Sequence, residues 1–127
     1  RGDADDTALA VAAFFGHLEV VQCLVASGAD LEATGETRYT PLMEAAQCRN
    51  RARSLDVVKF LLEAGADLSA TDGNGDTAIS HAYRSSRGRV LEYLVGIEGA
   101  PFGDVLKGVT REQVEERIKE LLDGGYR

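Results

Sequence analysis

The chain has 127 residues, a length that favours one domain whose core folds without disulfide or metal staples. Its 21 acidic residues outnumber its 14 lysines and arginines, and this net charge of −7 argues against a general nucleic-acid or anionic-membrane binder. The two cysteines form no CxxC pair, which argues against a disulfide framework and favours an intracellular, cytoplasmic or nuclear, location. No apolar stretch approaches the roughly 18 residues that span a bilayer, so membrane insertion is not expected.

Two helices and a turn are predicted over residues 2–34. The block T-A-L-A-V-A begins at Thr7, a residue type that caps helix N-termini. The block V-V-x-x-L-V from Val20 has the i, i+1, i+4, i+5 spacing of one helical face. Gly28 follows at a position where a left-handed residue ends a helix. The stretch therefore predicts a helix–loop–helix–turn unit.

The same blocks return over residues 35–71 and 72–100. T-P-L-M-E-A begins at Thr40 and T-A-I-S-H-A at Thr77, so the first blocks start 33 and 37 residues apart. The later blocks recur as V-V-x-x-L-L and G-A-D-L in the second copy and as V-L-x-x-L-V and a degraded G-A-P in the third. The four extra residues of the second copy fall at about 49–54 and predict a lengthened loop between its two helices.

A linker and one further helix are predicted over residues 101–127. Thr110 and Gln113 stand at the two ends of a capping box. Apolar residues follow at the spacing of one helical face, namely Val114, Ile118, Leu121 and Leu122. Because a stack of repeats needs its end covered, this helix is expected to cap the carboxyl end.

Together these blocks resemble the ankyrin repeat. The matching residues are T-P-L from Thr40 with Ala45-Ala46, Gly16-His17 before V-V, and G-A-D from Gly65. The resemblance implies an all-α fold, an ankyrin-repeat solenoid of three helix-turn-helix units (about 2–34, 35–71 and 72–100) closed by the C-terminal capping helix. It also implies a protein–protein interaction module that binds a partner protein or peptide through a concave face of turn tips and first helices.

The sequence contains no recognisable catalytic, metal-binding or cofactor-binding arrangement, so we interpret the chain as non-enzymatic and without a cofactor. Its two histidines and two cysteines lack the paired spacing of a zinc site. The D-G-N-G-D turn from Asp72 has Tyr83 where a calcium loop needs its twelfth-position glutamate. Cys23 lies in an apolar stripe and is expected to be buried. Cys48, at a helix end beside an arginine, is expected to be partly exposed.

Candidate partner-binding side chains lie at the turn tips and on the first helices. Aromatic anchors dominate interface energies, and Phe14-Phe15 occupy positions where the family usually has polar residues. These two phenylalanines either bind a partner or contact a preceding repeat. Tyr39, at a turn tip, is a further aromatic candidate. The predicted set is Phe14, Phe15, Glu36, Tyr39, Gln47 and Arg84.

A basic edge is also expected. The segments R-N-R-A-R-S from Arg49 and R-S-S-R-G-R from Arg84 contain no acidic residue, and stacked units place such matched loops side by side. Bidentate arginine contacts suit an acidic or phosphorylated partner. The residues assigned to this edge are Arg49, Arg51, Arg53, Arg87 and Arg89. The R-x-R-x-x-S pattern also makes Ser54 a candidate phosphorylation site.

Two functions stay open at this point. The first is binding of a partner protein through the concave face. The alternative is a regulatory or scaffold segment of a larger protein, an enzyme or channel, that packs in cis and uses the arginine edge. The absence of an initiator Met and the abrupt start of the first unit favour the alternative.

Overall fold

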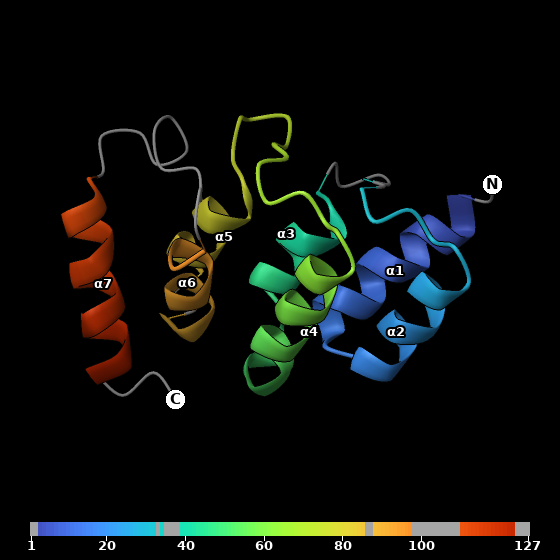
Figure 1. The fold of residues 1–127 in the computed structure, drawn as a ribbon, viewed down its shortest axis with the longest axis horizontal. Helices are drawn as coiled ribbons and strands as arrows, with labels where there is room; N and C mark the ends of the chain where they lie inside the picture. The colour runs from blue at the N-terminus through green and yellow to red at the C-terminus, as the bar shows by residue number, and fades with distance from the viewer. Residues whose placement is uncertain (1–2, 33, 35–38, 86–87, 98–109, 124–127) are drawn as a thin grey trace.

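The computed structural model describes residues 3–32, 34, 39–85, 88–97 and 110–123. Within these residues the chain forms seven α-helices and no strand, which confirms the all-α repeat fold (Figure 1). Three helix pairs are followed by a single helix. The helices are α1 (Asp3–Phe15), α2 (Leu18–Ala26), α3 (Pro41–Ala46), α4 (Arg51–Glu63), α5 (Ala78–Arg84), α6 (Gly88–Val95) and α7 (Arg111–Asp123).

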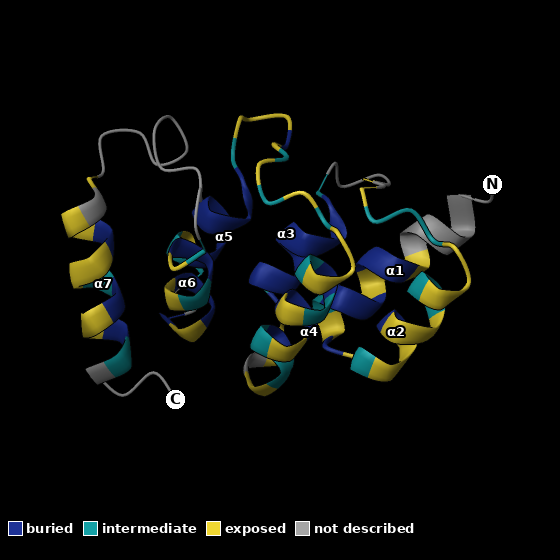
Figure 2. Cartoon of the chain, in the orientation of Figure 1, coloured by how far each residue is buried: buried dark blue, intermediate teal, exposed yellow. Residues whose placement is uncertain are grey.

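The pairs stack in chain order. The first helix of each pair packs on the next, α1 on α3 and α3 on α5, while α2 contacts α4 and α4 contacts α6. Buried alanines between the first helices, such as Ala13 and Ala46, let these backbones approach closely. The second helices contribute larger side chains, including Val57, Leu61 and Leu91, to the same continuous core. In Figure 2, α3 and α5 are almost wholly buried, whereas α2 is largely exposed.

Local signals place the start of α3 and the ends of α2 and α4 where the sequence predicts them, whereas α1 begins at Asp3 and Thr7 lies within it. Thr40 Oγ1 accepts a hydrogen bond from Met43 N at 3.2 Å, and Pro41 occupies the first turn of α3, where its missing N–H costs nothing. Gly28 and Gly65 adopt φ values of +97° and +111° after α2 and α4. These left-handed residues end the helices at low steric cost.

Helix α7 packs against α6, as a terminal cap would (Figure 1). Its capping box is formed, because Thr110 N donates to Gln113 Oε1 at 2.9 Å and Gln113 N donates to Thr110 Oγ1 at 3.2 Å. Val114, Ile118 and Leu121 are buried, and burial stabilises by roughly 1.5–3 kcal/mol for each such side chain. An added Cβ at Gly88 would lie 2.8 Å from Leu121 Cβ, so the close approach of α6 and α7 needs a glycine there.

The lengthened loop predicted at about 49–54 is wrong for residues 51–54, which are helical, although the connection 47–50 is longer than 16–17 and 85–87. Asn50 caps α4, and its side-chain oxygen accepts from Ala52 N at 3.1 Å and Arg53 N at 3.3 Å. The insertion therefore lengthens α4 to 13 residues, against 9 in α2 and 8 in α6. In the matched segment of the third unit, Arg84 ends α5 and Arg89 lies in the first turn of α6, while residues 86–87 lie outside the described residues.

Candidate protein-binding site

The first helices of the three pairs carry side chains at matched positions. Counted from the threonine of each first block, the eighth residue is Phe14 in α1, Gln47 beside α3 and Arg84 in α5. Phe14 and Gln47 are half-buried and Arg84 is exposed. Because α1, α3 and α5 pack in sequence, these three side chains form one row across the stack. We call Phe14, Gln47 and Arg84 the first-helix row.

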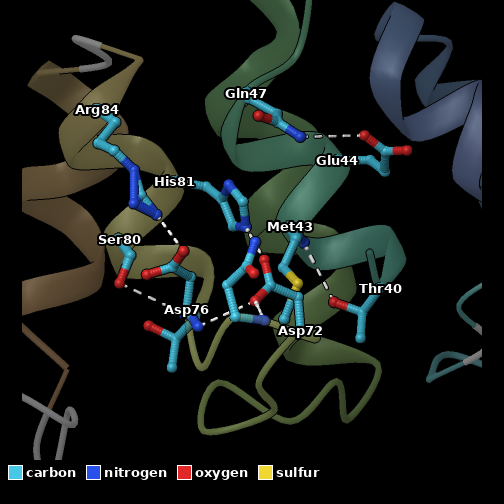
Figure 3. A network of polar contacts seen from close by, with 11 residues as sticks. Thr40, Met43, Glu44, Gln47, Asp72, Asp76, Ser80, His81 and Arg84 are labelled. Atoms are coloured by element: carbon cyan, nitrogen blue, oxygen red, sulfur yellow. Dashed lines mark hydrogen bonds and ion pairs between the residues drawn. The ribbon is translucent and has the colours of Figure 1, made fainter. Parts of the chain in front are cut away.

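Acidic neighbours hold two members of this row in place (Figure 3). Gln47 Nε2 donates to Glu44 Oε1 at 3.3 Å. The Arg84 guanidinium forms an ion pair with the carboxylate of Asp76, which belongs to the turn before α5. Such contacts restrict the rotamers of both side chains, so less conformational entropy is lost when they bind a partner.

The turn before α5 is built around the side chain of Asp72. Its Oδ1 accepts from Asn74 N at 2.8 Å and Asp76 N at 3.0 Å, and Gly75 supplies a φ of +83°. Its Oδ2 lies 3.0 Å from His81 Nε2, within a pair that is almost fully buried. An ionised carboxylate only accepts hydrogen bonds, so the Nε2–H of His81 is the donor.

The charge of Asp72 is favoured by these contacts. Burial taken alone raises the pKa of its carboxyl group. The backbone N–H groups of Asp76 and Asn74 and the imidazole of His81 outweigh that effect, so the pKa of Asp72 lies below its ordinary value. The turn is consequently held by an ionised group at neutral pH.

Tyr39 connects the second and third units. Its ring meets the His81 ring edge to face, with centroids 4.7 Å apart and planes inclined by 62°. Tyr39 is therefore half-buried, and removing its ring would also uncover a buried histidine. The contacts of His81 with Tyr39 and Asp72 were not predicted. One sequence signal points to them. His81 is polar, whereas the equivalent residue of the first unit is Val11.

Phe15 does not point in the same direction as the first-helix row. It is 40% exposed and stacks on His17, while Phe14 meets its ring edge to face at 5.1 Å. Phe15 shares a helix face with Val11, four residues earlier, rather than with Phe14. Glu36, the remaining predicted partner-binding residue, lies outside the described residues.

The arginine edge is only partly within the described structure. Arg49 and Arg89 are exposed, whereas Arg53 is partly covered and lies 4.0 Å from Asp56 in an exposed ion pair. The Arg51 side chain and the whole of Arg87 lie outside the described residues. The contact between α4 and α6 places the helices that carry Arg53 and Arg89 next to each other.

Three single-residue predictions are corrected by the structure. Cys48 is fully buried and its Sγ donates to Asn50 O at 3.3 Å, whereas Cys23 is exposed, so the expected environments are reversed. The reason is that no described helix pair lies on the outer side of α2, while α3 lies between α1 and α5. Ser54 is also buried and its Oγ donates to Ala45 O at 2.7 Å, which removes it as an accessible phosphorylation site in the folded chain.

No three His, Cys, Asp or Glu side chains gather into a metal-ligand group among the described residues. In the same part of the chain, none of the helices is long and apolar enough to cross a membrane. The face that carries the first-helix row thus offers hydrogen bonds, a cation and an aromatic ring, which suits recognition of a protein surface.

Comparison with known families matches most of the chain. A family model described as ankyrin repeats (3 copies) matches residues 1–72, and one described as ankyrin repeats (many copies) matches residues 51–95. No curated protein matches the chain. The matched ranges extend from the start of α1 to the end of α6.

Proposed function

Because the chain belongs to the ankyrin repeat family, whose repeats generally bind other proteins, we propose that it binds a partner protein through the face of α1, α3 and α5. The observation that carries this proposal is the first-helix row, in which an aromatic, an amide and a cationic side chain occupy matched positions on packed helices. Tyr39 and Glu36 are proposed to extend the same face at the turn before α3.

The row specifies the chemistry of the partner. Packed helix axes are about 8–10 Å apart, so the three side chains span about 16–20 Å. We expect a partner segment that presents an apolar group to Phe14, a hydrogen-bonding group to Gln47 and a carboxylate to Arg84. A carboxylate would share the guanidinium with Asp76, and arginine offers enough donors for both.

Site-specific crosslinking tests this face without disturbing the core. A photoreactive residue at position 47 or 84 is expected to capture the same partner from cell extract, because both positions lie on the proposed face. The matched control is position 59, where Lys59 is exposed on α4 and lies over the Tyr93 ring at 5.3 Å. Capture of one protein equally well from all three positions would contradict binding at this face.

A second candidate is an acidic or phosphorylated partner at the arginine edge. The packing of α4 on α6 favours it, since exposed Arg89 and partly exposed Arg53 begin these neighbouring helices and Arg49 precedes α4. Arg89→Glu combined with Arg49→Glu is expected to abolish binding of a phosphopeptide while leaving crosslinking from position 47 unchanged. Retained phosphopeptide binding would exclude this edge.

We further propose a non-catalytic, intracellular role for the whole module, since the family is typically non-catalytic. In this proposal the three units (about 2–34, 35–71 and 72–100) and the terminal helix in 101–127 act together, either free or as a regulatory segment of a larger protein. If the purified chain binds its partner but turns over no substrate when the two are combined, this proposal is supported. Reproducible substrate turnover by the chain would contradict it.

A further inference from the structure

The amino-terminal end of the stack carries apolar side chains that no described part of the chain covers. Val11 and Phe15 lie four residues apart on one face of α1, together with exposed Ala8, and Val20 is exposed on α2. We call Ala8, Val11, Phe15 and Val20 the amino-terminal face. These valines and Phe15 are the only large hydrophobic side chains exposed among the described residues.

Equivalent residues in the later units are buried, although those of the amino-terminal face are exposed. Val20 is 48% exposed, whereas its equivalents Val57 and Val90 in the next two units are 0% and 2% exposed. Val11 is 49% exposed, and the equivalent side chains in α3 and α5 are 8% and 6% exposed. The same sequence position is thus buried in every unit that has a helix pair before it.

Other positions follow the same rule. Exposed Ala8 corresponds to two buried residues, Pro41 and Ala78, and half-buried Leu24 corresponds to two fully buried leucines, Leu61 and Leu94. Positions on the outer side of the second helices do not follow it, because Gln22 and its equivalents Lys59 and Glu92 are all exposed. The extra exposure is therefore confined to the side on which units stack.

The cover on the equivalent positions is a helix pair in each case. Helix α1 packs on α3 and α2 contacts α4, and the second and third pairs repeat this arrangement. At one point of this interface, a Cβ on Gly16 would lie 3.2 Å from Cys48 Sγ. The turn after the first helix of one unit therefore lies against the residue that corresponds to Phe15.

We propose that the amino-terminal face docks a further ankyrin-type helix pair, whose first helix presents small side chains as Ala12-Ala13 do toward α3. The docking would continue the two stacking interfaces already present in the structure. Phe15 is larger than Cys48, so the docked pair needs a glycine, as at Gly16, where its first turn meets Phe15. This site is separate from the proposed partner-binding face, and neither proposal depends on the other.

A second copy of this chain is a poorer occupant. The carboxyl end of its own stack is covered by α7, which packs on α6. A second copy would have to offer either that helix or another amino-terminal face, neither of which presents paired small residues. A second copy is therefore an alternative outcome of the test.

The test compares the chain with an extended version. Residues 40–76, with Arg49→Gly in the added copy, are duplicated in front of Thr7, so that Asp76 is joined to Thr7 as it is joined to Thr77 in the natural chain. Val20→Asp is expected to change the unfolding constant of the natural chain less than about threefold, since exposed positions tolerate substitution. In the extended chain it is expected to change by about tenfold or more, because the aspartate is buried.

Gln22→Asp is the matched control and is expected to have little effect in either chain. Cys23 should also react with a thiol reagent more slowly in the extended chain, because its equivalents Phe60 and Tyr93 are partly covered. An equal effect of Val20→Asp in both chains, or unchanged Cys23 labelling, would overturn the proposal, including when the added pair fails to fold. Sedimentation equilibrium that shows a dimer of the natural chain, dissociated by Val20→Asp, would assign the face to a second copy instead.

Discussion

Replacing Asp72 by alanine is expected to be among the most damaging single changes on the proposed binding face. The carboxylate accepts two backbone N–H bonds within the turn before α5 and a third bond from His81. Its side chain is 1% exposed and that of His81 is 7% exposed, so water does not replace the lost contacts. Each buried donor left without its acceptor costs about 1–3 kcal/mol, so the three together take a large share of the roughly 5–15 kcal/mol that stabilises a domain.

Asp72→Asn separates the contributions. The amide oxygen still accepts the two backbone bonds, but the amide NH₂ faces the donor nitrogen of His81. We therefore expect this variant to lose about 1–3 kcal/mol, which is the cost of one charge-assisted bond. Urea unfolding followed by circular dichroism would measure the free energy of unfolding of each variant. At pH 7 we expect the parent to be the most stable, Asp72→Asn to be less stable and Asp72→Ala to be the least stable.

The pH dependence supplies an independent check. The pKa of Asp72 lies below its ordinary 3.8, so the carboxylate stabilises the fold above about pH 4 and this contribution is lost as the pH falls through the folded pKa. The difference between parent and Asp72→Asn should therefore shrink below about pH 4. A constant difference from pH 7 to pH 3, or an alanine variant as stable as the parent, would refute the role given to this carboxylate.

Three further results are expected. Gly16→Ala should lower the free energy of unfolding by about 2–5 kcal/mol, because φ is +76° and the new Cβ would lie 2.9 Å from a side-chain carbon. Gly28→Ala, whose Cβ would lie in open space, should lower it by only about 1–2 kcal/mol. Urea unfolding measures both changes. Burial, the largest effect, and nearby carboxylates raise the pKa of Glu32. Glu32→Gln should therefore stabilise the fold at pH 7 but not below the ordinary pKa of 4.5, and unfolding measured at several pH values would show this. Thiol labelling of the native protein should modify Cys23 at once and Cys48 only after unfolding.

For each of these predictions, a specific result would contradict the reasoning. Equal costs for the two glycine variants would mean that the neighbours of Gly16 yield freely to a methyl group. A Glu32→Gln variant that is no more stable at pH 7 would show that the N–H of Asp67, which donates to Glu32 Oε2 at 2.8 Å, outweighs burial. Rapid labelling of both thiols would contradict the burial of Cys48.

Much of the fold could be predicted because its signals are local. The capping threonine and first-turn proline of α3, the left-handed glycines and the capping box of α7 each act within four residues along the chain. The repeat of three blocks adds the stacking order, since each unit exposes an apolar face that only a neighbour can cover. The loop predicted at 49–54 from the four extra residues of the second unit is mostly helix, because Asn50 caps α4 within it.

The amino-acid sequence was enough to predict three repeated helix pairs, their order and the terminal helix, because these depend on short-range patterns. Packing between units, in contrast, determines which equivalent side chains are covered and which are exposed. Val20 and Val57 occupy the same place in the repeat, yet they differ in burial. A helix pair packs before the unit of Val57, and no described helix pair packs before the unit of Val20. The contacts of His81 with Asp72 and Tyr39 likewise arise from packing across units, and no local pattern encodes them.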